Sequence, residues 1–154
     1  MVLKACELLN IVLSALVTGV FWGPWVGLTR SIATFEPAAF LAIGYRLNVN
    51  LAPLMTVLMP VALLTAVPTL VLSVGGRPAT FVLTLIGVLL FVVALVVTLA
   101  IEVPIAARIK SWASGTALPD DWRQQRDRWA AVHVVRVATG IAGLGLLVAG
   151  AVFG

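Results

Sequence analysis

The residue types that could carry out chemistry lie on one face near the start of the last hydrophobic stretch of the chain. Six residues recur there at spacings of 4, 3, 4, 3 and 4: Trp122, Arg126, Trp129, His133, Arg136 and Gly140. On a helix of about 100° per residue these spacings keep all six within an arc of about 80°. An arginine or histidine that faces lipid costs a few kcal/mol, so this face is predicted to point into the protein.

Glu102 is the acidic residue expected to pair with this face. It lies at the end of the third hydrophobic stretch where His133 enters the fourth, and Pro104 cannot donate the helical hydrogen bond to the Ala100 carbonyl. A carboxylate, an imidazole and a guanidinium at similar depth are expected to pair. Such a cluster can be a buried ion pair that fixes helix packing, or it can move a proton.

The composition shows which elements must position these groups. The chain has 154 residues, of which 62% are hydrophobic and 10% charged, whereas soluble domains are about 25% charged. Four charge-poor stretches are each long enough for a spanning helix of roughly 20 residues: residues 8–29, 47–76, 78–101 and 129–154, the last interrupted by His133 and Arg136.

These stretches predict an all-α fold, an integral membrane four-helix bundle of up-down topology. We expect a single transmembrane domain over residues 1–154, with helices at about 5–28, 48–73, 79–110 and 120–152. Residues 30–47 are too polar and too short to span, and they predict a short interfacial helix between the first and second spans.

Residue counts exclude several kinds of redox site. Cys6 is the only cysteine, which excludes an internal disulfide or a thiol pair. His133 is the only histidine, which excludes bis-histidine haem ligation, and the two Glu-x-x-His motifs of a di-iron site are absent. The sequence therefore predicts no metal ligand set and no cofactor.

Basic residues predict the orientation in the membrane. With four spans, the first and third loops share a side and hold seven basic residues: Arg30, Arg46, Arg108, Lys110, Arg123, Arg126 and Arg128. The other side holds Lys4 and Arg77. Because basic residues gather on the cytoplasmic side, we expect loops one and three in the cytoplasm and both termini outside, in a bacterial-type inner membrane. The net charge of +4 then requires no nucleic acid partner.

Two motifs carry a resemblance to a known family. They are E-V-P-I-x-x-x-I-x-x-W over residues 102–112 and D-W-R-x-x-R-x-R-W-x-x-x-H-x-x-R over residues 121–136, and the stretch LNVNLAPLMTVLMP over residues 47–60 adds to them. In these motifs the chain resembles the anthrone-oxygenase-like family of small four-helix membrane proteins, most of which have no assigned function. The resemblance implies oxygenation of lipophilic polyketide anthrones to quinones without metal or flavin.

The resemblance also implies roles for the cluster. His133 is the candidate base, since an unperturbed histidine changes charge between pH 5 and 8. Glu102 would orient the ring, and Arg136 would stabilise the developing phenolate or peroxide anion. The aromatic and basic residues nearby are the candidates for binding a flat substrate: Trp129, Trp122, Trp112 and Arg126.

Two other functions stay open from the sequence. One is a non-catalytic membrane scaffold or assembly partner, in which the Glu102, His133 and Arg136 cluster only fixes helix packing. The other is a small transporter, which is disfavoured because proton-coupled carriers generally place an acid near mid-membrane. The expected partners are membrane lipid and a lipophilic small molecule, and a homo-oligomer is left open.

Overall fold

The described part of the chain is mostly helical and contains no strand. The computed structural model describes residues 1–113, 115 and 118–154. Its elements, in chain order, are α1 (Val2–Gly27), the 3₁₀ helix η1 (Thr29–Thr34), α2 (Pro37–Ser73), α3 (Pro78–Val97), the π-helix η2 (Thr98–Glu102), α4 (Val103–Ala113) and α5 (Trp122–Phe153). The prediction of an all-α fold is confirmed.

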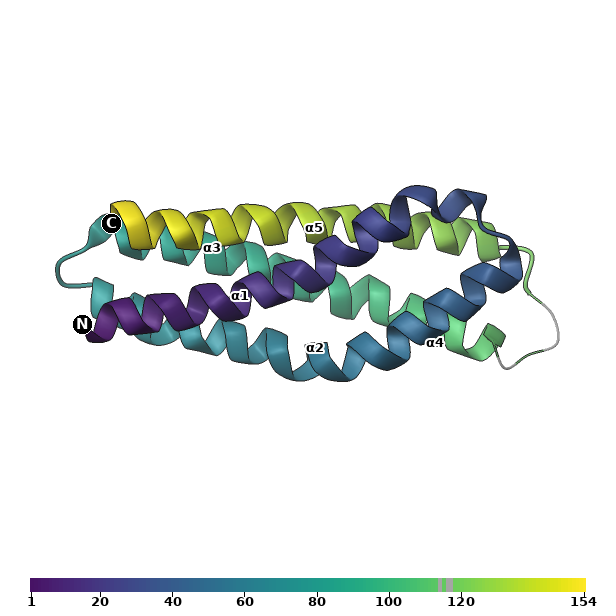
Figure 1. Ribbon diagram of the computed structural model, residues 1–154, viewed down its shortest axis with the longest axis horizontal. Coiled ribbons are helices and arrows are strands. Elements are labelled where there is room, and N and C mark those ends of the chain that lie inside the picture. The colour runs from purple at the N-terminus through teal and green to yellow at the C-terminus, as the bar shows by residue number, and fades with distance from the viewer. Residues whose placement is uncertain (114, 116–117) are drawn as a thin grey trace.

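Four helical segments of the described chain are long and apolar enough to cross a membrane: Val2–Thr34, Pro37–Ser73, Pro78–Ala113 and Trp122–Phe153. The predicted four spans are therefore confirmed, and the chain is an integral membrane protein. In Figure 1 both ends of the chain lie at the same end of the bundle, and successive segments run back and forth along its length.

The start of the second span differs from the sequence prediction. Between the first two spans η1 forms a short 3₁₀ helix, and α2 begins at Pro37 instead of near residue 48. The reason is length. At about 1.5 Å per residue, a helix of 37 residues extends far beyond a hydrocarbon core of roughly 30 Å. Its first turns can therefore remain helical outside the lipid.

The third span changes its helical pitch beside the acidic residue. α3 passes through the π-helix η2, which ends at Glu102, and continues as α4. Pro104 has no N–H for the carbonyl four residues earlier, which agrees with a local departure from α-helical hydrogen bonding at this point. Single-turn π-helices inside α-helices are frequent at functional sites.

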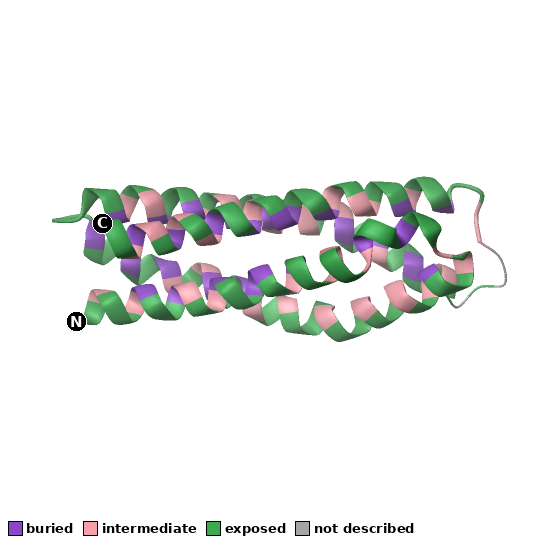
Figure 2. Cartoon of the chain, turned by 45° about the horizontal axis from the view of Figure 1, so that its top comes forward, coloured by how far each residue is buried: buried purple, intermediate pink, exposed green. Residues whose placement is uncertain are grey.

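Close packing is concentrated in the part of the bundle near the two termini. A Cβ atom on Gly143 of α5 would lie 3.0 Å from the Gly87 carbonyl oxygen of α3, so the two backbones are in contact. Polar side chains bond across helices in the same region, with Asn10 donating to the Ala62 carbonyl at 2.7 Å. Figure 2 shows buried residues recurring along the inner sides of the helices. Small residues and interhelical hydrogen bonds are the usual means by which membrane helices associate.

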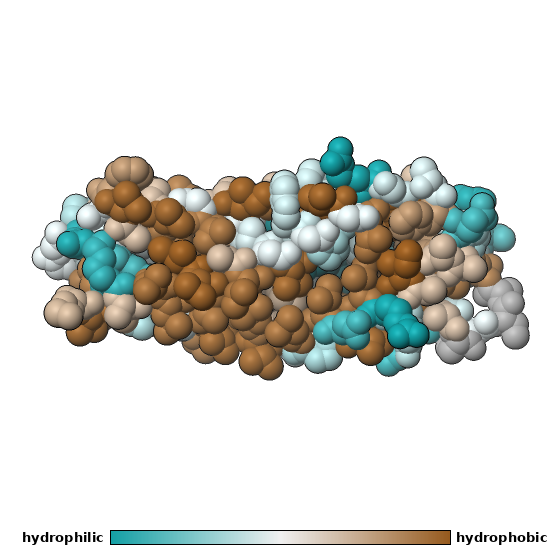
Figure 3. Space-filling model, viewed as in Figure 1, coloured by the Kyte–Doolittle hydropathy of each residue, from teal (hydrophilic) through white to brown (hydrophobic). Residues whose placement is uncertain are grey.

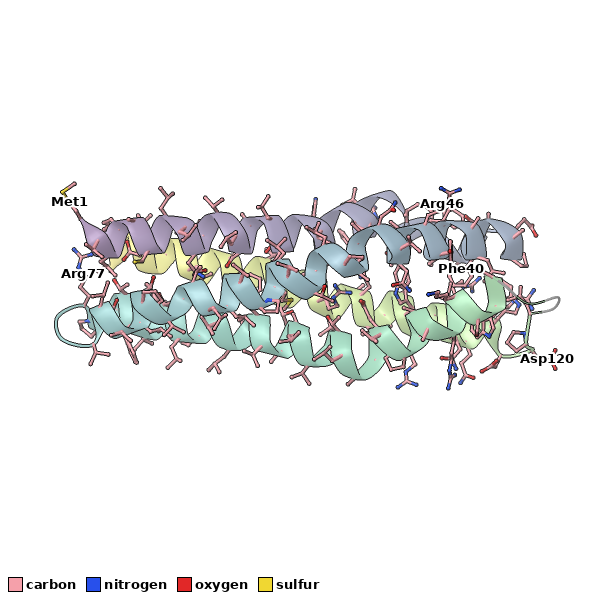
Figure 4. All side chains as sticks on the ribbon, turned by 90° about the horizontal axis from the view of Figure 1, so that it is seen from below. Met1, Phe40, Arg46, Arg77 and Asp120 are labelled. Carbon is pink, nitrogen blue, oxygen red and sulfur yellow. The ribbon has the colours of Figure 1, made fainter. Side chains whose placement is uncertain are left out.

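The surface carries the polarity expected of a membrane protein. On the face shown in Figure 3, hydrophobic side chains cover most of the bundle, and hydrophilic ones gather towards its two ends. Figure 4 labels Arg77 close to Met1 at one end, and Arg46 and Asp120 towards the other. The basic loop residues are thus divided between the two ends of the bundle.

Candidate functional site

A cavity of about 150 Å³ lies in the part of the bundle away from the termini. All four spans contribute to its wall, which is mostly apolar. Val20, Pro24 and Leu28 come from α1, and Leu47 and Met55 come from α2. Ligand sites are commonly cavities of this kind, apolar with a few polar groups that fix orientation.

The polar groups of the wall centre on Glu102. Its Oε1 lies 3.2 Å from Nδ1 of His133, and its Oε2 forms an ion pair with Nη1 of Arg136. The three residues are 7%, 3% and 8% exposed, respectively, and all three line the cavity. Because buried charges are tolerated only when paired and hydrogen-bonded, this cluster requires all of its members together.

The hydrogen bond of the second ring nitrogen of His133 shows which of the two nitrogens must carry a proton. Nε2 lies 3.0 Å from the backbone carbonyl oxygen of Phe21. A carbonyl can only accept, so Nε2 carries a hydrogen and donates it. The contact between Nδ1 and Glu102 then needs one more proton, which is shared by the imidazole and the carboxyl group.

Two aromatic rings hold the basic members of the cluster. The Trp129 indole stacks on the His133 ring, with centroids 5.2 Å apart and an interplanar angle of 15°. The Arg136 guanidinium lies 4.2 Å from the centroid of the Phe21 ring. In the described part of the chain, Nε of Arg136 is buried and has no hydrogen-bond partner. It is an unused donor on a cationic group that lines the cavity.

The structure thus brings four of the sequence-predicted site residues to one cavity: Glu102, Trp129, His133 and Arg136. The convergence follows from the face that these residues share on α5 and from the position of η2 beside it. Gly140 lies on the same face below the cluster, and a Cβ atom there would meet the Phe21 ring at 3.0 Å.

The other three candidates lie outside the cavity lining that the described residues define. Trp122 is 7% exposed and belongs to an apolar cluster with Phe40 and Ile109, and Trp112 packs against that cluster. Arg126 pairs with the neighbouring Asp127 at 2.8 Å and lies over the Trp122 ring. None of these three residues lines the cavity, so the structure does not support the substrate-binding role expected of them.

Sequence reasoning missed Asn48, a polar residue of the cavity wall. It is half-buried on α2 among apolar wall residues such as Leu47 and Leu51. The sequence does contain a signal for it, because Asn48 is a polar residue in a stretch that has no charged residue.

A metal site is not evident from the side chains. Within residues 1–113, 115 and 118–154, no group of three or more His, Cys, Asp or Glu residues is arranged to hold a metal ion. The cluster contributes one carboxylate and one imidazole, and both ring nitrogens of the imidazole are engaged. What the arrangement can do is bind, transfer a proton and stabilise an anion.

The family comparison gives one match. A family model described as anthrone oxygenase matches residues 45–146. The match covers more than half of the chain and contains all four converging residues. Among curated proteins and among solved structures, none matches the chain.

Proposed function

The chain belongs to the anthrone oxygenase family, and on that premise we propose that it is a membrane-embedded oxygenase of a lipophilic aromatic substrate of the anthrone or phenolic polyketide type. The observation that carries this proposal is the Glu102, His133 and Arg136 cluster on the wall of an apolar cavity. A packing role would need the ion pair but no cavity beside it.

The proposed reaction converts a benzylic CH₂ group to a carbonyl with one molecule of oxygen. A base removes one proton from the carbon, which is acidic because the anion is delocalised as a phenolate. The carbanion reduces O₂ and bonds to it, giving a peroxide at that carbon, which takes up a proton. Loss of the second C–H proton and cleavage of the O–O bond release water and leave the quinone. Because the carbanion itself reduces oxygen, the proposed reaction needs no metal or flavin.

Glu102 accepts the proton in this proposal, and His133 positions it. The roles are the reverse of those expected from sequence, because Nε2 of His133 donates to Phe21 and Nδ1 is covered by Glu102. Neither ring nitrogen has a free lone pair for the substrate. A carboxylate oxygen has two lone pairs, so Glu102 can bond to His133 and still accept a proton from the cavity.

Arg136 stabilises the anion as it forms. Its Nη1 is paired with Glu102, whereas its buried Nε has no partner among the described residues. The guanidinium lines the cavity, and its positive charge would stabilise a substrate oxygen that gains negative charge in the reaction. Donors already in place where charge develops act most strongly in a site from which water is excluded.

The test is proton exchange with oxygen excluded. Under anaerobic conditions in D₂O, the protein should exchange the benzylic protons of anthrone, and Glu102→Gln should slow this exchange by about 10²- to 10⁴-fold, the usual contribution of a positioned base. Glu7→Gln is the matched control. Glu7 is also a buried glutamate with a basic partner, Lys4 at 3.0 Å, but it lies near the N-terminus, and its replacement should leave exchange unchanged.

The folded state needs a separate control, because Glu102→Gln leaves Arg136 buried without its counter-ion, a loss that can cost about 3–5 kcal/mol. The double variant Glu102→Gln/Arg136→Gln removes both charges and should fold while remaining inactive. If the wild-type protein neither exchanges anthrone protons nor consumes oxygen, the cluster serves helix packing and the protein is a scaffold.

We also propose that the cavity end of the bundle faces the cytoplasm. Arg77 lies at the end that carries Met1, and the residues of the basic first and third loops lie towards the other end (Figure 4). In a Cys6→Ser background, a membrane-impermeant maleimide added outside should modify Arg77→Cys and leave Gly115→Cys unmodified. The opposite labelling pattern would reverse the orientation.

A further inference from the structure

Among the residues that the structure describes, Asn48 is the only one with a side-chain amide on the wall of the cavity described above. It is half-buried on α2, in a sequence that carries no charge from residue 47 to residue 76. Its side chain has no hydrogen-bond partner among the residues that the structure describes. Its NH₂ group and its carbonyl oxygen are therefore not used by the described residues of the protein.

The other asparagine on a buried face of the bundle shows how a packing amide behaves. Asn10 of α1 is 2% exposed, and its side chain donates to the Ala62 carbonyl at 2.7 Å and to the Thr65 hydroxyl at 3.1 Å. Both acceptors lie on α2, so Asn10 joins two helices. Buried polar groups are nearly always satisfied in this way. Asn48 joins no pair of helices, which argues against a packing role.

Thr98, a second uncharged polar residue that lines the cavity, is already engaged. Its hydroxyl donates to the Ala94 carbonyl at 2.7 Å. Asn48 comes from α2, whereas Glu102 comes from η2 and His133 and Arg136 from α5. The cavity therefore presents a charged cluster on two elements and a separate neutral donor and acceptor on a third.

We propose that Asn48 binds a second polar group of the substrate, a ring hydroxyl distinct from the oxygen that Arg136 stabilises, and that it thereby selects hydroxylated ring systems and sets their orientation. An amide donates and accepts, and so does a phenolic hydroxyl, so the two groups match in both directions. This inference rests on the proposed function, because it takes the occupant of the cavity to be a flat aromatic compound. Sites that hydrogen-bond a substrate hydroxyl discriminate against analogues that lack it.

The test compares the binding of quinones, which cannot be oxidised further by the proposed reaction. The probes are 9,10-anthraquinone and its 1-hydroxy and 2-hydroxy derivatives, titrated against the detergent-solubilised protein. The wild-type protein should bind one hydroxy derivative about tenfold more tightly than anthraquinone, the contribution of one neutral hydrogen bond. Asn48→Leu should abolish this preference and leave the affinity for anthraquinone nearly unchanged.

Asn50→Leu is the matched control. Asn50 lies two residues further along α2 and is exposed, so its replacement should keep the preference. Asn48→Ala is a second variant that removes both the donor and the acceptor without adding bulk, and it should also lose the preference.

A preference that persists in both Asn48 variants, or that is absent from the wild-type protein, overturns this inference alone, provided that anthraquinone binds and anthrone protons exchange. A wild-type protein that binds none of the three quinones and exchanges no anthrone protons overturns the proposed function and this inference together.

Discussion

The two halves of the bundle are held together by different means. In the half near the termini, the α3 and α5 backbones meet at Gly87 and Gly143, and neutral side chains such as Asn10 bond across helices. In the other half, the same four spans surround a cavity, and the polar contacts are made by the charged residues Glu102 and Arg136. The difference suggests that one half contributes mainly to stability and the other to chemistry.

Side-chain size and helix geometry explain the difference. Glycine lets two helices approach closely, whereas the cavity half carries aromatic rings and long basic side chains facing inward. The third span also departs from α-helical geometry beside the cavity, in the π-helix η2, whereas prolines lie in both halves, with Pro60 and Pro68 of α2 nearer the termini. A π-turn bends a helix, and a bent helix cannot stay in contact with its neighbours along its whole length.

Among the changes that compare the two halves, the largest expected effect comes from filling the cavity. Ala106 of α4 lines it, whereas the neighbouring Ala107 is exposed. Ala106→Phe should lower oxygen consumption with anthrone by about a hundredfold, because the added ring occupies the space of the substrate. Ala107→Phe adds the same ring outside the cavity and should keep the wild-type rate. Equal rates for the two variants would mean that the cavity is not the site.

The next largest effect comes from separating the backbones in the half near the termini. A Cβ atom on Gly143 would lie 3.0 Å from both the Gly87 carbonyl oxygen and the Phe91 ring, whereas one on Gly145 would meet nothing within 4 Å. Gly143→Ala should therefore lower the free energy of unfolding by about 1–3 kcal/mol, the usual cost of overpacking. Gly145→Ala should leave it unchanged, as measured by unfolding in mixed micelles. Similar stabilities would show that the α3 and α5 contact is loose.

The smallest effect should come from a neutral interhelical hydrogen bond. Asn10→Leu removes the bonds from α1 to Ala62 and Thr65 of α2. In membrane proteins such bonds contribute about 0.6 kcal/mol on average, so the unfolding midpoint should fall slightly while the turnover of anthrone is unchanged. A loss of activity with full stability would contradict the division between a stabilising half and a chemical half.

The sequence predicted the spans and four members of the candidate site for a simple reason. A hydrocarbon core admits only long apolar helices, so four charge-poor stretches leave little choice of fold. An inward face is likewise required when histidine and arginine enter such a helix. The positions of Trp129, His133 and Arg136 on one face follow from helical periodicity alone, and Glu102 is the nearest acid in the neighbouring span.

The residue at which the second helix begins could not be predicted from composition in the same way. The sequence indicated a break near residue 48, whereas α2 runs unbroken from Pro37. A change from polar to apolar residues marks where a helix enters lipid, but backbone hydrogen bonding decides where it begins, and that bonding continues on both sides of the boundary.

Only the tertiary structure decided which hydrogen bonds the cluster forms and which residues reach the cavity. His133 donates to the Phe21 carbonyl, a backbone group 112 positions away in the sequence, and no pattern of side chains encodes such a partner. His133 and Trp122 share one face of α5, but His133 lines the cavity whereas Trp122 belongs to a separate apolar cluster. A shared face determines the direction in which two side chains point, but not which neighbours they meet along the helix axis. The proposed role of Asn48 depends on the packing of the four helices, which leaves its amide without a partner among the described residues.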